Sequence, residues 1–370
     1  MAHIRKRGKK YSVIIELEKS SEGRRRQKYI GTYVSKKKAE EVLLSTENAR
    51  LNNTYIAENK ILFNDYVEEY FNQEITKRAK TTQNDYRILI EKYIKKYFDN
   101  MRLQAISVVN IQDYFNNYIR DLNPKTVRKH YAVLNGVFTR AFKSELITKN
   151  LCDYVTLPKV EQREVVRLEL EEIRNILEKS KESNFNLEIN LAINLGLRLG
   201  EILGLKWEDV NFKKNTIDIN RSFNVVNGEP LLKEPKTKSG KRQLASNKEI
   251  MDLLHKELLR QKQERLKDKD FNELNLVCVN RDGRYVNPRT LSKEFSNWLK
   301  KIGFKHIRFH DLRHANATLM LLGGVQPKVA SKRLGHSKIS TTMDIYTDVL
   351  KELDVDVAEK LESILYKKQS

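Results

Sequence analysis

Near its C-terminus the 370-residue sequence reads His310-Asp311-Leu312-Arg313-His314, continues with Leu334-Gly335-His336-Ser337, and then with Thr341-Thr342-Met343-Asp344-Ile345-Tyr346. An upstream segment, Gly196-Leu197-Arg198-Leu199-Gly200-Glu201, supplies a second arginine. Arginine binds phosphate oxygens in pairs, histidine moves protons near neutral pH, and a tyrosine hydroxyl is a candidate nucleophile. Together these residue types indicate the handling of a phosphodiester.

The histidine and arginine of the first motif are expected to share one face of a helix, because His310 and Arg313 are three residues apart. On such a helix Leu312 is expected to point into the core, and His314 is expected to point away from the face that His310 and Arg313 share. A second, short helix is expected from Pro327 to Leu334, ended by Gly335 with His336 just beyond it.

The tyrosine is ambiguous when it is considered alone. Met343 and Leu350 lie at helical spacing from Tyr346, which favours a core tyrosine. The alternative is a nucleophile, and it gains support from the arginines and histidines of the same segment. The segment around Arg198 is also open to two interpretations: an internal ion pair with Glu201 or Asp209, or an arginine aimed at an anion and oriented by Glu201.

A basic stretch runs from Glu234 to Arg242 and is expected to form a hairpin with Ser239-Gly240 as its turn. One interpretation is an exposed, charged turn. The functional interpretation places Lys238 against a scissile phosphate, and the flanking phosphates would then be contacted by Lys236, Lys241 and Arg242.

The formal net charge of +21 indicates a polyanionic partner, with nucleic acid as the first candidate and a merely solubilising surface as the alternative. Hydrophobic residues make up 39%, enough for sizeable cores. Only Cys152 and Cys278 occur, so we expect core thiols in a reducing compartment. Neither a signal peptide nor a membrane-spanning stretch is recognisable, which predicts a cytoplasmic protein without a membrane partner.

The charge and periodicity patterns predict three domains, over residues 1–56, 61–158 and 165–370. The first combines strands at 4–7, 11–17 and 24–33 with a helix that begins after Ser35. Its basic strand favours DNA contact over a charged, solvated edge strand, and the residues concerned are Arg24, Arg25, Arg26 and Lys28.

The second domain is expected to be a helical bundle, because apolar residues recur at helical spacing in four segments. Asn123 and Pro124 open the last helix as N-cap and first helical residue. His130 is interpreted as a surface or hydrogen-bonded histidine and not as a ligand. A basic face suits phosphate contacts, and the candidates are Lys125, Arg128 and Lys129.

The ordered set Arg198, Lys238, His310, Arg313, His336 and Tyr346 resembles the tyrosine recombinase (phage integrase) family, over about residues 165–350. More loosely, the whole layout is similar to integrases of phages and conjugative transposons. The resemblance implies a multidomain fold, mainly α with small β-sheets. An N-terminal three-stranded sheet with a helix would bind arm-type DNA, a helical bundle would bind the core site, and the α+β domain would be catalytic.

The resemblance also implies a mechanism. Tyr346 would attack to leave a 3′-phosphotyrosine, Arg198 and Arg313 would hold the phosphate, and Lys238 would act as the general acid. His310 would transfer protons and His336 would support the phosphate or the base. No cofactor or metal is implied.

Similar enzymes act as homo-tetramers on double-stranded core and arm-type attachment sites, so the expected setting is the bacterial nucleoid. An excisionase and a host DNA-bending protein are further candidate partners. The segment Val355 to Leu365 is expected to be a helix that packs on its own domain or on a neighbouring subunit.

Three other functions are alternatives. A type IB topoisomerase would share the chemistry but relax DNA, and the separate basic N-terminal sheet argues against it. A non-catalytic DNA-binding regulator, or a structural nucleoid protein, would fit a chain that had lost its polar motif residues, and none are lost.

Overall fold

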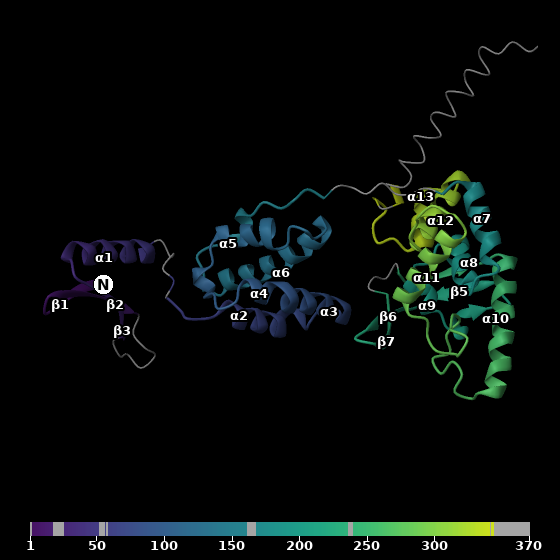
Figure 1. Cartoon of the computed structure of the whole chain (residues 1–370), viewed down its shortest axis with the longest axis horizontal. Coiled ribbons are helices and arrows are strands. Elements are labelled where there is room, and N and C mark those ends of the chain that lie inside the picture. The colour runs from purple at the N-terminus through teal and green to yellow at the C-terminus, as the bar shows by residue number, and fades with distance from the viewer. Residues whose placement is uncertain are drawn as a thin grey trace, which may run out of the picture. The chain divides into compact units, whose positions relative to one another are not determined.

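The computed structural model describes residues 2–17, 26–51, 56, 58–160, 168–235, 240–340 and 342–343. The chain divides into two compact units, residues 1–161 and 162–370 (Figure 1). Among the described residues no helix combines the length and the apolar character needed to cross a membrane.

The N-terminal sheet has three antiparallel strands, β1 (Ala2–Arg7), β2 (Lys10–Leu17) and β3 (Arg26–Tyr33), with β2 in the middle. Helix α1 (Lys36–Leu51) packs against the sheet. A β-bulge between Val13 and Ile14 lets both of these residues and Ile15 be buried, where strict alternation would expose one of them. The predicted sheet with one helix is confirmed.

The rest of the first unit is helical, and its core combines aliphatic and aromatic side chains. Its elements are α2 (Phe63–Tyr70), the π-helical turn η1 (Phe71–Ile75), α3 (Lys80–Leu89), η2 (Ile90–Ile94), α4 (Lys95–Tyr97), η3 (Leu103–Ala105), α5 (Val108–Asp113), η4 (Tyr114–Tyr118), α6 (Pro124–Lys143) and η5 (Leu151–Tyr154). Asn123 caps α6, since its side chain accepts a hydrogen bond from the Lys125 backbone at 2.9 Å. The predicted helical segment and its cap are confirmed.

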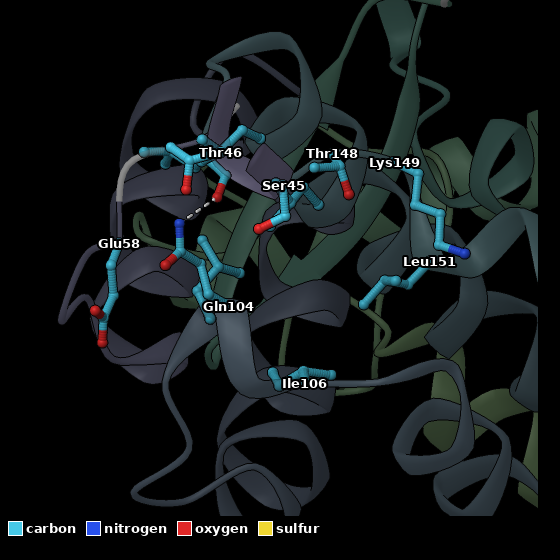
Figure 2. A pocket seen from close by; sticks show the side chains of 12 residues that line it. Ser45, Thr46, Glu58, Gln104, Ile106, Thr148, Lys149 and Leu151 are labelled. Atoms are coloured by element: carbon cyan, nitrogen blue, oxygen red, sulfur yellow. Dashed lines mark hydrogen bonds between the residues drawn. The ribbon is translucent and has the colours of Figure 1, made fainter. Parts of the chain in front are cut away.

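Figure 2 shows a pocket of about 470 Å³ in this unit, lined partly by Ser45 and Thr46 of α1 and by Gln104. Its polar side chains have partners within the unit. Thr46 Oγ1 donates to the Val42 carbonyl at 2.6 Å, and Gln104 Nε2 donates to the Leu146 carbonyl at 2.9 Å. None of the site residues predicted from the sequence lines this pocket.

The second unit combines helices with two small antiparallel sheets. Its helices are α7 (Leu170–Ser180), α8 (Asn186–Leu195), α9 (Leu199–Leu203), η6 (Trp207–Asp209), α10 (Lys248–Lys267), α11 (Pro288–Lys301), α12 (Asp311–Leu322) and α13 (Pro327–Leu334). Its strands are β4 (Val210–Asn211), β5 (Thr216–Ile219), β6 (Ser222–Val226), β7 (Glu229–Lys233) and β8 (Arg242–Ala245). Helix α8 packs against α7, α10 and α12, and these contacts enclose one apolar core.

The strand pairing corrects the predicted hairpin at Glu234–Arg242. The strands on either side of that segment belong to different sheets, because β7 pairs with β6 and β8 pairs with β5. The hairpin lies earlier, where Asn227 and Gly228 both adopt positive φ between β6 and β7. An Asn-Gly pair is the strongest short signal for such a turn, and the sequence analysis did not use it.

Candidate active site

The site is organised around the end of α8. Gly196 ends this helix in the left-handed conformation, with φ of 65°. A Cβ atom at this position would lie 2.4 Å from Asn316 Oδ1 and 2.5 Å from Leu334 Cδ2. Only glycine therefore allows α8, α12 and α13 to approach so closely, and this approach brings the upstream arginine to the C-terminal motifs.

Arg198 follows immediately and forms the N-cap of α9. Its Nη1 donates to Glu201 Oε1 at 2.7 Å, and its Nη2 donates to the Gly335 carbonyl at 3.0 Å. The Arg198 side chain is 40% exposed, whereas that of Glu201 is 5% exposed. The internal ion pair with Glu201 is therefore present, and it orients a guanidinium that keeps an open side. That this open side faces an anion stays a prediction. The other proposed partner, Asp209, pairs instead with Arg221 at 2.9 Å.

Arg313 lies on α12, is 3% exposed and is the second arginine of the site. Its guanidinium donates to the Gly196 carbonyl and, at 2.7 Å, to the Leu334 carbonyl. Burial, followed by the positive charge of Arg198, lowers the pKa of Arg313 to about 9. The two arginines thus bind the consecutive carbonyls of Leu334 and Gly335, which places them side by side.

His336 is held next to this arginine pair. Gly335 ends α13 with φ of 68°, and His336 Nδ1 forms a 2.8 Å hydrogen bond with Thr342 Oγ1. Burial and then the charges of Arg313 and Arg198 lower the pKa of His336 to about 4. The imidazole is therefore neutral near pH 7 and can accept a proton or a hydrogen bond.

His310 stands at the N-terminal end of α12. Loss of solvent, then the neighbouring His314 and Arg313, lowers its pKa to about 4, although one side of the residue remains exposed. The expectation that His314 points elsewhere was wrong. The two imidazoles meet edge to face, with ring centroids 5.0 Å apart. Their spacing of four residues was the signal that could have predicted this contact.

Arg242 requires a second correction. The sequence analysis placed it among the residues that contact flanking phosphates, but its side chain is only 6% exposed. Its Nε donates to the Arg333 carbonyl at 2.7 Å, and its terminal nitrogens bind both carboxylate oxygens of Glu201 at 3.3 and 2.9 Å. These internal bonds leave little of the guanidinium for a DNA phosphate.

For the other residues expected to contact DNA, this role stays a prediction. Lys125, Arg128 and Lys129 are exposed on α6, and Lys129 forms an ion pair with Asp85 at 3.4 Å. Lys241 is exposed and pairs with Glu234 at 3.0 Å. Lys28 lies on β3, and the backbone of Arg26 begins that strand.

Several predicted residues lie outside the described residues. They are Tyr346, Lys238, Lys236, Arg24, Arg25 and the segment Val355 to Leu365. Along the sequence, the described residues nearest to Tyr346 and Lys238 are Met343 and Gly240. Over the described ranges, no group of three or more histidine, cysteine, aspartate or glutamate side chains is arranged to hold a metal ion.

Comparison with known families matches residues 166–352 to the phage integrase family. Residues 62–119 match the SAM-like N-terminal domain of phage integrases. The chain is 27% identical to the ICEBs1 integrase of Bacillus subtilis, over 79% of this chain and 80% of that protein. It is 25% identical to the integrase of Staphylococcus phage L54a, over 86% of this chain and 97% of that protein.

Solved structures show the same fold. The Tn1549 transposon integrase in complex with transposon right end DNA superimposes with a TM-score of 0.64 at 19% identity, covering 79% of this chain and 99% of that one. A λ integrase dimer bound to a core site gives a TM-score of 0.60 at 18% identity, with 93% of each chain covered.

The fold and the matches define a class of enzymes that cleave and rejoin DNA, the tyrosine recombinases. This chain belongs to the phage integrase family.

Proposed function

We propose that this protein is a site-specific integrase that cuts and rejoins DNA through a 3′-phosphotyrosyl intermediate, and thereby integrates and excises a mobile element. The observation that carries the proposal is the arginine pair on the Leu334 and Gly335 carbonyls, with the neutral His336 beside it. Integrases of an integrative element and of a phage are among the similar proteins, which supports a mobile element as the setting.

In the proposed reaction the Tyr346 oxygen attacks the scissile phosphorus. The new bond joins phosphorus to the tyrosine oxygen, and the bond to the 5′-oxygen breaks. His310 accepts the phenolic proton, and Lys238 gives a proton to the leaving 5′-oxygen. A histidine whose pKa is about 4 is neutral at pH 7 and therefore able to act as this base.

The arginines supply the electrostatic part of the reaction. Charge gathers on the non-bridging oxygens in the transition state, and one well-placed donor stabilises it by roughly 3–4 kcal/mol. Arg313 remains protonated at neutral pH even with its pKa lowered to about 9. The Gly196 and Leu334 carbonyls orient its guanidinium and take one N–H donor each, so its other donors remain for the phosphate. Arg198 offers its open side to the same phosphate.

The phosphotyrosyl bond retains the free energy of the broken phosphodiester, so rejoining needs neither ATP nor a metal ion. The proposed assembly is a homo-tetramer on paired core and arm-type attachment sites, with an excisionase and a host DNA-bending protein as further partners. A λ integrase tetramer on a Holliday junction has a related fold, with a TM-score of 0.57, and supports this assembly.

A suicide substrate tests the proposal. In a duplex that carries the core site and a nick close to the scissile phosphate, attack releases the short fragment that bears the new 5′-hydroxyl. This fragment diffuses away, so the covalent adduct accumulates. We expect an adduct with the wild-type protein and none with Tyr346→Phe, measured as a shifted band on a denaturing gel. An adduct with the substituted protein would show that another residue is the nucleophile.

The same preparation distinguishes exchange from relaxation. Paired attachment sites on one plasmid should yield recombined products. Relaxed plasmid without recombinants would favour the topoisomerase alternative.

A further inference from the structure

Among the described residues of the second unit, Arg242 is a buried cation that the proposed mechanism does not use. Its side chain is 6% exposed, and the Glu201 side chain to which it binds is 5% exposed. Burial of a charged pair is unfavourable unless hydrogen bonds compensate for the lost water. The position therefore needs an explanation beyond the general stability of the fold.

The bonds of Arg242 reach three separate parts of the site. Nη2 donates to Glu201 Oε2 at 2.9 Å, and the other oxygen of this carboxylate holds Arg198 at 2.7 Å. Nε donates at 2.7 Å to the carbonyl of Arg333, close to the end of α13. Nη1 also donates at 3.3 Å to the carbonyl of Gly240, which follows Lys238 by two residues in the sequence.

These partners connect Arg242 to the segments that carry Arg198 and His336 and to the chain that follows Lys238. Arg242 itself need not contact the phosphate. Residues 333 to 336 carry the carbonyls that hold Arg198 and Arg313, and they lead directly to His336. A second bond between the same two elements, from Arg333 Nη2 to the Ala245 carbonyl at 3.0 Å, strengthens the attachment of α13 to β8.

We infer that Arg242 is a positioning residue, which fixes Glu201, the end of α13 and the chain after Lys238 in one geometry and thereby sets the angle at which Arg198 meets the scissile phosphate. The inference rests on the proposed function. A planar guanidinium is required, because only its fork bonds both carboxylate oxygens while Nε reaches a carbonyl on the other side.

The proposed role of Arg242 can also be tested through the pKa of Glu201 and the pH dependence of cleavage. Burial is the largest single effect on the pKa of Glu201 and raises it. The effects of Arg242 and then Arg198 together outweigh burial, so the pKa is held below its usual value. Arg313 also faces this carboxylate. Removal of Arg242 should raise the pKa of Glu201, so that protonation at mildly acidic pH releases Arg198.

The test compares Arg242→Lys and Arg242→Gln with the wild type on the nicked substrate. Both variants should cleave roughly 10- to 100-fold more slowly at saturating DNA, because small displacements of a catalytic group have effects of this size. The DNA concentration for half-maximal rate should be unchanged. The rate of Arg242→Gln should also fall with decreasing pH in a range where the wild-type rate is constant.

Arg221→Gln is the matched control. It removes a partly buried arginine of the same unit that pairs with Asp209 at 2.9 Å and Glu208 at 2.8 Å. Its cleavage rate should stay within about threefold of the wild type, because the carboxylates that Arg221 binds are not the one that holds Arg198. If Arg242→Gln fails to fold, judged by its melting temperature, Arg242→Lys retains the charge and carries the comparison.

A folded Arg242 variant with the wild-type rate and pH profile would overturn the inference. So would a variant that changes only the half-maximal DNA concentration, because that result would assign Arg242 to DNA binding. Absence of an adduct with the wild type itself would instead refute the proposed function.

Discussion

Two histidines with the same pKa show how differently the two units of this protein use a buried imidazole. His130 of the first unit and His336 of the second both have pKa values lowered to about 4. For His130 burial is the cause: the ring is fully buried, hydrogen-bonded to Tyr114 at 2.6 Å and packed edge-on against Tyr93. For His336 the charges of Arg313 and Arg198 add to burial.

The difference teaches that a lowered histidine pKa indicates a functional site only when neighbouring charges share in causing it. His130 packs within an aromatic core, where a neutral imidazole serves as one more ring. His336 lies near the guanidinium groups of Arg198, Arg313 and Arg242. In the part of the chain that the structure describes, Arg198 and Arg242 pair with the same carboxylate, that of Glu201. Such a surplus of positive charge is unfavourable by itself and becomes favourable when an anion binds.

The largest effect is expected from the arginine with an open side. Arg198→Gln should lower the rate of adduct formation roughly 100- to 1000-fold, because it removes a donor aimed at the developing phosphate charge. The melting temperature should change little, since 40% of the Arg198 side chain is exposed. Single-turnover cleavage and thermal unfolding measure both quantities.

Arg221→Gln again serves as the control for loss of an arginine ion pair. If the Arg198 variant cleaves within tenfold of the wild type, the positive charge beside His336 has no catalytic role. The surroundings of His336 would then be no more functional than those of His130.

The intermediate effect concerns His130 and stability. Its pKa is about 4 in the folded protein and 6.5 in the unfolded chain, so the unfolded state binds more protons between these values. The stabilisation is therefore fully present above pH 6.5 and is lost as the pH falls toward 4. His130→Phe removes this titration, and the free energy of unfolding of the wild type should drop by about 2–3 kcal/mol more than that of the variant between pH 7 and 4.5.

Urea unfolding at the two pH values provides the measurement. Adduct formation at pH 7 should be retained in folded His130→Phe, in contrast to substitutions at the arginine pair. Equal pH sensitivity of the wild type and the variant would contradict the assignment of His130 as a neutral core residue.

The smallest effect is expected at the exposed cations of the first unit. Single alanine substitutions of Lys125, Arg128 and Lys129 should each weaken DNA binding several-fold and reduce the salt dependence of log K by about one. The rate at saturating DNA should not change, because these residues lie on α6 and not at the arginine pair. Binding titrations at several salt concentrations measure the slope.

Lys267→Ala on α10 is a suitable control, since this lysine is exposed and paired with Glu264 at 2.9 Å. An unchanged slope for all three α6 variants would mean that this face does not contact phosphates. The basic charge of the first unit would then have to act through its N-terminal sheet.

Much of the local structure could be predicted because local rules govern it. The Asn123 cap, the proline that opens α6 and the glycine that ends α13 were all recognisable from residue types at defined positions. The residue types of the motifs also indicated phosphodiester chemistry. Each of these inferences depends on interactions between residues only a few positions apart.

By itself, then, the sequence determined the helices, their ends and the chemical kinds of side chain available for the reaction. The tertiary structure alone decided that Arg242 is buried against Glu201, and that β7 and β8 lie in different sheets. The physical reason is distance along the chain. The bonds of Arg242 to Glu201 and Arg333 span 41 and 91 residues, and no local spacing encodes which of many basic side chains will be enclosed when such distant segments pack together.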